Sequence, residues 1–226
     1  MSTRTPGLRV TGLETEFGVL CAPVGPPEEM KADLPDVERA AALIFRHRPV
    51  GYRSTNLFLP NGGRLYLDIG AHPEYATAEC VRVRDLVAQD QAGRAILADM
   101  ARRAAARLAQ EGTAARFHLL ANNTDSAGHT YGCHESYSVP RSLLDVTDDA
   151  TRASSETAMA VLTSFLATRP VLVGSGRPLA GGPTESKQGS RGAGEEAAWG
   201  LSPRAPHLQA LTSADTTGQR ALVNTR

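Results

Sequence analysis

Lysine is almost absent from this sequence of 226 residues. Only Lys31 and Lys187 occur among 24 basic side chains, and arginine supplies the other 22. The basic and acidic side chains balance at 24 each, which argues against a protein whose main function is to bind nucleic acid or an anionic membrane. Aromatic residues are also few, at 5%, but the 41% hydrophobic content is that of a folded globular protein.

Cysteines and long apolar runs are scarce as well. The three cysteines, Cys21, Cys80 and Cys133, lie far apart without a C-x-x-C pair, which disfavours a disulfide framework or zinc knuckle and fits a reducing cytosol. We expect no membrane span, because no apolar run reaches about 18 residues. Met1–Gly7 lacks the apolar core of a signal peptide. The sequence therefore predicts a soluble, cytoplasmic protein.

Hydrophobic periodicity predicts an α+β fold, with a largely antiparallel sheet and helices packed on one face. Gly181–Gly200 is rich in Gly, Ser and Glu and is predicted to be a mobile loop. The predicted elements are a strand over Leu8–Cys21, a helix opening at Pro35 with Asp33 or Leu34 as its cap, a hairpin of Leu57–Leu59 with Arg64–Ile69, a helix over Arg82–Glu111 stopped by Gly112, a strand over Phe117–Ala121, a helix over Arg152–Thr168 and a strand over Val171–Val173.

Two predicted strands each carry polar side chains on one face. Residues two apart on a strand point the same way, so Glu14 and Glu16 project together. By the same spacing Arg64, Tyr66 and Asp68 share a face, opposite a clean apolar face. Two adjacent carboxylates repel each other unless a cation or protons separate them. The alternative interpretation of the first pair is a solvent-facing acidic strand edge.

The segment after the hairpin adds Glu74 and Glu79 to these carboxylates, and Pro73 favours an extended conformation at His72. Several carboxylates with a tyrosine oxygen and an arginine indicate a site for a hard cation that also meets an anion. Ordinary surface charges, with Arg64 in a salt bridge, are the alternative. The polar stretch Asn122–Glu135 is typical of a loop that wraps a ligand, or of a turn-rich connector.

Four motifs follow one another along the chain. They are Gly12-Leu13-Glu14-Thr15-Glu16-Phe17-Gly18-Val19, Arg53-Ser54-Thr55-Asn56, Asn61–Asp68 with His72–Cys80, and Asn122–Gly128 with Tyr131–Glu135. In this order they resemble the Pup ligase and Pup deamidase family, whose members are relatives of glutamine synthetase. The resemblance runs from about residue 8 to the terminal Asn-Thr-Arg, and is weakest over 176–221.

The resemblance implies a glutamine synthetase-like catalytic domain that uses ATP and Mg²⁺. It implies that Glu14, Tyr66 and Glu74 hold Mg²⁺, that Arg64 and Thr77 contact ATP, and that Asp68 is the catalytic base. Glu16, Asn123, His134 and Glu135 are assigned to the same site, Asn123 toward the nucleotide and the other three toward the metal.

The implied reaction is ATP-dependent ligation of Pup, a small ubiquitin-like protein, to lysine-bearing substrate proteins. The C-terminal glutamate of Pup would be phosphorylated on its side chain before a substrate lysine displaces the phosphate. No nucleic acid or membrane partner is expected. The short interval between Glu16 and Arg64 favours the ligase over the deamidase, which carries a long extra loop there.

The family's chains continue well past the Asn-Thr-Arg segment. The resemblance therefore implies that residues 1–226 are the N-terminal portion of the catalytic domain, without the C-terminal remainder. A truncated, non-catalytic relative that binds Pup or ATP is the other interpretation left open.

Overall fold

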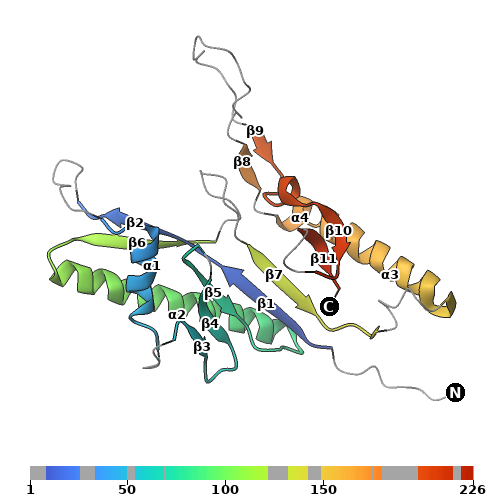
Figure 1. The fold of residues 1–226 in the computed structure, drawn as a ribbon, viewed down its shortest axis with the longest axis horizontal. Helices are drawn as coiled ribbons and strands as arrows, with labels where there is room; N and C mark the ends of the chain where they lie inside the picture. The colour runs from blue at the N-terminus through green and yellow to red at the C-terminus, as the bar shows by residue number, and fades with distance from the viewer. Residues whose placement is uncertain are drawn as a thin grey trace, which may run out of the picture. The chain divides into compact units, whose positions relative to one another are not determined.

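The computed structural model describes residues 9–25, 34–49, 54–68, 70–121, 132–141, 149–174, 176–179, 198–215 and 220–225. The chain divides into two compact units, Met1–Ser138 and Val139–Arg226. Figure 1 shows the elements of each unit along the chain.

The first unit is built on a five-stranded sheet with the order β3-β4-β5-β1-β7. Every neighbouring pair in it is antiparallel. The sequence prediction of a largely antiparallel sheet in an α+β fold is thus confirmed. The strands are β1 (Thr11–Glu16), β3 (Asn56–Phe58), β4 (Arg64–Asp68), β5 (His72–Ala76) and β7 (Cys133–Tyr137).

The strand predicted over Leu8–Cys21 is wrong in its continuity, because the structure divides it at Phe17. β1 ends at Glu16, and β2 (Gly18–Pro23) then pairs in a separate ladder with β6 (Ala115–Leu120). The backbone N–H of Phe17 donates to the carbonyl of Pro73 at 2.9 Å, and the Phe17 ring is buried. The chain therefore changes partner strands at an anchored aromatic residue.

Two helices supply the rest of this core. α1 (Val37–Phe45) is capped by Asp36, whose side chain accepts from the backbone N–H of Arg39 at 2.8 Å, so the predicted caps Asp33 and Leu34 are wrong. α2 (Val83–Gln110) agrees with the predicted helix to within one residue at each end. It contacts β1, β5 and β6 and runs behind β5 and β1 in Figure 1. Buried core residues include Val19, Ala41, Ile44, Phe45, Leu57, Leu65, Leu97, Met100, Leu108 and Phe117.

Tyr75 joins the sheet to α2. Its ring is 2% exposed, and its hydroxyl accepts from Asn61 Nδ2 and donates to Gln89 Oε1, both at 2.9 Å. The ring lies so close to α2 that a Cβ added at Gly93 would be 2.2 Å from Tyr75 Cδ1. Gly93 therefore allows β5 to approach the helix.

The second unit contains α3 (Asp149–Thr168), where the sequence predicted a helix, and α4 (Pro170–Val173). The predicted strand over Val171–Val173 is wrong: Pro170 occupies the first turn of a short helix, a position that its fixed φ favours. Five short elements follow, four strands in two small ladders and one turn of 3-10 helix. They are β8 (Arg177–Leu179) with β9 (Ala198–Gly200), η3 (Ala205–His207), and the parallel pair β10 (Ala210–Ser213) and β11 (Ala221–Asn224).

Two sequence expectations concern residues of this unit. Most of the predicted loop Gly181–Gly200 lies outside the described residues, and its last three residues form β9. Contrary to the expectation of no spanning segment, the helical stretch Arg152–Val173 is long and apolar enough to cross a membrane by length and composition alone. One such helix is weak evidence for a span.

Replacing Gly93 by alanine is expected to destabilise the chain by about 1–3 kcal/mol, because the new methyl group overlaps the Tyr75 ring. This loss outweighs the gain in helix propensity, which is at most about 1 kcal/mol. Urea unfolding followed by circular dichroism measures the change. Gln91→Ala, at an exposed position two residues earlier, is the matched control. A Gly93→Ala chain as stable as the control would refute the close packing.

Candidate functional site

The pairing of the strands brings the predicted polar residues to one face of the sheet. Glu16 and Tyr66 are both in register with Glu74, from opposite sides of β5. Asp68 pairs with His72. Directly paired residues point to the same face, so these side chains share the face opposite to Tyr75 and α2. The face predicted from the spacing of two therefore exists and extends over three strands.

Three carboxylates converge on this face. One oxygen from each of Glu16, Asp68 and Glu74 lies within 4.8 Å of the other two. Oxygens on opposite sides of an octahedral Mg²⁺ are about 4.2 Å apart, since each Mg–O distance is about 2.1 Å. The donor set consists of oxygen atoms only, which suits Mg²⁺ or Mn²⁺ rather than zinc. The residues present thus fit a hard divalent cation.

Glu14 lies beside this group and is held on both oxygens. The Tyr66 hydroxyl donates to Oε1, and His134 Nδ1 lies 2.8 Å from Oε2. The hydrogen bond from His134, helped by the one from Tyr66, lowers the pKa of Glu14 against the opposing effect of burial. Burial and the hydrogen bonds to Glu14 and Glu74 raise the pKa of Tyr66, so it stays a neutral phenol.

Glu74 is the most buried member, at 4% exposure. Burial raises its pKa to about 7, the Tyr66 hydrogen bond opposes the rise, and the negative charges of Glu14, Glu16 and Asp68 add to it. Without a cation, the cluster thus relieves its repulsion by keeping a proton near neutral pH. A bound divalent ion would replace that proton.

Arg64 and Thr77 are both predicted to contact ATP. Arg64 lies on the face that carries the cluster, whereas Thr77 is hydrogen-bonded to Leu13, a residue of the opposite face. Arg64 Nε donates to Asn56 Oδ1 at 2.9 Å, and its guanidinium lies 4.3 Å from the centroid of the Tyr66 ring. Thr77 Oγ1 accepts from the backbone N–H of Leu13 at 3.0 Å, which ties the end of β5 to β1. Asn123, the third predicted nucleotide contact, lies outside the described residues.

The two predicted metal ligands on β7 lie on opposite faces of the sheet. His134 pairs with Glu14 in the register and faces the cluster, whereas Glu135 pairs with Leu13 on the opposite face. There the Tyr137 hydroxyl donates to Glu135 Oε2 at 2.5 Å. The sequence interpretation treated this segment as a loop, but consecutive residues of a strand point to opposite faces. The structure therefore does not bring Glu135 to the carboxylates.

His72 belongs to the site and was missed as a site residue. Its Nδ1 lies 2.5 Å from Glu16 Oε1. Counting the register of the hairpin would have found it, because pairing Tyr66 with Glu74 places His72 opposite Asp68.

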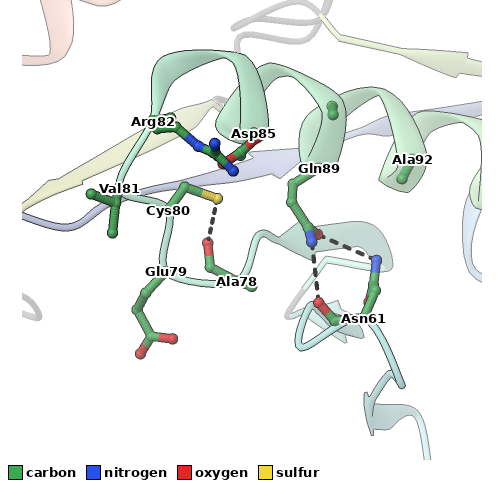
Figure 2. Close-up of a pocket in the computed structure, with 10 residues that line it drawn as sticks. Asn61, Ala78, Glu79, Cys80, Val81, Arg82, Asp85, Gln89 and Ala92 are labelled. Atoms are coloured by element: carbon green, nitrogen blue, oxygen red, sulfur yellow. Dashed lines mark hydrogen bonds and ion pairs between the residues drawn. The ribbon is translucent and has the colours of Figure 1, made fainter.

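A surface hollow of about 750 Å³ lies elsewhere in this unit, between the segment that follows β5 and the start of α2. Figure 2 shows Arg82 and Asp85 on one side of it and the hydrogen-bonded pair Asn61 and Gln89 on another. The Cys80 thiol there donates to the carbonyl of Ala78 at 3.3 Å. None of the predicted site residues that the structure describes lines this hollow.

Comparisons with known proteins agree with this fold. The family model described as Pup-ligase protein matches residues 9–226. The chain is 43% identical over 218 residues to a Pup–protein ligase of Jonesia denitrificans, covering 96% of this chain and 42% of the relative. It is 45% identical over 219 residues to one of Xylanimonas cellulosilytica, with the same coverage.

Two solved structures match as well. One is the complex between the prokaryotic ubiquitin-like protein Pup and its ligase PafA, with a TM-score of 0.66 and 34% identity over 88% of this chain and 35% of that one. The other is PafA in complex with ADP, with a TM-score of 0.53 and 37% identity over 82% of this chain and 36% of that one.

The fold is therefore that of the glutamine synthetase-like ligases. The chain belongs to the Pup ligase family. It spans 42% of the length of these curated relatives.

The raised pKa of Glu74 predicts how stability depends on pH without a divalent cation. The folded chain holds a proton on Glu74 up to about pH 7, and the unfolded chain loses it near 4.5. The contribution of this group to stability is therefore fully present below about pH 4.5 and is lost as the pH rises through 7. Glu74→Gln cannot ionise. Its free energy of unfolding should exceed that of the unsubstituted chain by up to about 3 kcal/mol at pH 8 and equal it at pH 4.5.

Urea unfolding in EDTA at the two pH values measures this difference. Glu79→Gln, at an exposed position five residues later, is the control that should show no such dependence. An equal difference at pH 4.5 and pH 8 would contradict the buried, protonated state of Glu74.

Proposed function

We propose that this chain supplies the cation site and the catalytic base of an ATP-dependent carboxylate–amine ligase that joins Pup to substrate proteins. The observation that carries the proposal is the convergence of the carboxylate oxygens of Glu16, Asp68 and Glu74 within 4.8 Å, on the sheet face that also presents Arg64 and Tyr66. Family membership and the relatives' names support the reaction. They also favour ligation over deamidation.

Mg²⁺ would be held by Glu14, Glu16, Glu74 and the hydroxyl oxygen of Tyr66. It would supply positive charge next to the phosphate oxygens of ATP. His134 contacts Glu14 Oε2, so we assign it to orienting that carboxylate instead of binding the metal. We leave Glu135 out of the ligand set because it lies on the other face.

Arg64, Thr77 and Asn123 remain the proposed nucleotide contacts. The Arg64 guanidinium is fixed between the Asn56 amide and the Tyr66 ring, where it can face phosphate oxygens. A planar guanidinium suits this role because its donors match phosphate geometry.

The proposed reaction has two steps. The γ-phosphoryl group of ATP passes to a side-chain carboxylate oxygen of the C-terminal glutamate of Pup, and ADP leaves. The amine of a substrate lysine then attacks the carbonyl carbon, and phosphate leaves as the isopeptide bond forms. Asp68, exposed at the end of β4, would take the proton that the ammonium must lose before it attacks. A cytoplasmic location, where ATP is available, is part of the proposal.

Asp68→Asn is expected to reduce conjugate formation by about 10²–10⁴-fold, because the amide cannot accept the proton. Binding of ATP should be retained. The assay mixes the chain with ATP, Mg²⁺, Pup ending in Glu and a lysine-bearing protein, and follows conjugates by gel electrophoresis. Asp85→Asn, on the exposed first turn of α2, is the matched control and should conjugate normally.

Three results would change the proposal. Full activity of Asp68→Asn would remove Asp68 from the role of base. Ammonia release from Pup ending in Gln, without conjugates, would identify a deamidase instead. Retention of ATP or Pup by the unsubstituted chain without either reaction would identify a binding protein.

A further inference from the structure

Glu16 is held on both carboxylate oxygens, by a side chain of β5 and by the backbone of the residue before β7. His72 Nδ1 lies 2.5 Å from Oε1, and the backbone N–H of Gly132 donates to Oε2 at 3.0 Å. The His72 and Glu16 side chains are 16% and 14% exposed, so little water competes for this contact. A carboxylate only accepts hydrogen bonds, so the Nδ1 atom of His72 carries the hydrogen.

The sheet fixes the position of His72 as firmly as that of Glu16. His72 opens β5 opposite Asp68, and Pro73 restricts its backbone to the extended region. Its ring also packs over the turn before β5, because a Cβ added at Gly70 would lie 3.4 Å from His72 Cε1. The backbone of His72 is therefore fixed in the extended region, its ring packs beside Gly70, and its Nδ1–H has Glu16 as acceptor.

We propose that His72 is a positioning residue for the cation site: its Nδ1–H, with the Gly132 N–H, holds the Glu16 carboxylate in the one orientation that faces Asp68 and Glu74. This inference rests on the proposed function, because it assumes that the carboxylate cluster binds a divalent cation. His72 itself contacts Glu16 and acts through it.

The reason for such a residue follows from the charges. Glu16 must keep one oxygen within 4.8 Å of oxygens of Glu74 and Asp68, and the negative charge of Asp68 repels it. A free glutamate side chain would turn away from them before a cation arrives. Hydrogen bonds that fix a carboxylate from outside the metal site remove this freedom, and losing such a partner typically lowers metal affinity 10–100-fold.

A second histidine offers an internal comparison. His134 contacts Glu14 in the same way, through Nδ1 at 2.8 Å, but its side chain is 62% exposed. Exposed contacts of this kind contribute little because water and salt compete for them. The geometry therefore assigns the larger effect to His72.

The test is binding of Mn²⁺ to the full chain, without nucleotide, measured by isothermal titration calorimetry and by the loss of the free-ion electron paramagnetic resonance signal. His72→Leu should weaken binding about 10–100-fold. His72→Asn should stay within about threefold of the unsubstituted chain, because the Asn amide nitrogen occupies the place of Nδ1. His134→Leu should weaken binding less than His72→Leu does. His47→Leu, after the end of α1, is the control and should bind normally.

The outcomes separate the two proposals. If the unsubstituted chain binds no Mn²⁺, the cation site of the proposed function fails, and the role of His72 fails with it. If it binds and His72→Leu binds equally well, only the role of His72 is overturned.

Circular dichroism of each variant checks its folding. If His72→Leu does not fold, the comparison of His72→Asn with His72→Gln decides, since Gln places its N–H near Nε2 instead of Nδ1. Equal affinity of these two variants would show that the Nδ1 contact does not position Glu16.

Discussion

Repulsion between carboxylates on one face of the sheet is the constraint on which the site depends. Each of these groups would prefer water or a distant neighbour, yet the strand register fixes Glu14, Glu16 and Glu74 side by side. Hydrogen-bond donors around the carboxylates, together with one proton, offset this repulsion. Tyr66 and His134 bind Glu14, His72 and the Gly132 N–H bind Glu16, and a proton settles on the buried Glu74. The centre of the cluster still carries excess negative charge, which a divalent cation would neutralise.

The opposite face of the same strands explains why the carboxylates can be held in place. Tyr75 lies between Glu74 and Ala76 in β5, and its ring is clamped against α2 where Gly93 leaves room. Thr15, between the two glutamates of β1, donates to Asp90 of α2 at 3.1 Å. Alternation along β1 and β5 thus places an anchored residue next to each of their glutamates. The free energy that orders the site comes from burial on the far side of the sheet.

The sequence predicted what depends on local periodicity and missed what depends on pairing between strands. A spacing of two was enough to place Arg64, Tyr66 and Asp68 together, and helical spacing gave α2 to within one residue. The break at Phe17 was missed because both halves are extended, and their different partner strands are what distinguish them. His72 and Glu135 show the same limit. Their places follow from the register, which no single segment reveals.

The three carboxylates of the cluster differ in solvent exposure, and this difference bears on their chemical roles. Glu74 is 4% exposed, Glu16 is 14% exposed in its side chain, and Asp68 lies in the open at the end of β4. A carboxylate that neutralises a divalent cation is a poor base, because its charge is already shared with the ion. A base must also reach a substrate amine that arrives from solvent. In the proposed reaction, this difference in exposure favours the cation at the buried end of the cluster and the proton transfer at Asp68, although all three oxygens lie within 4.8 Å.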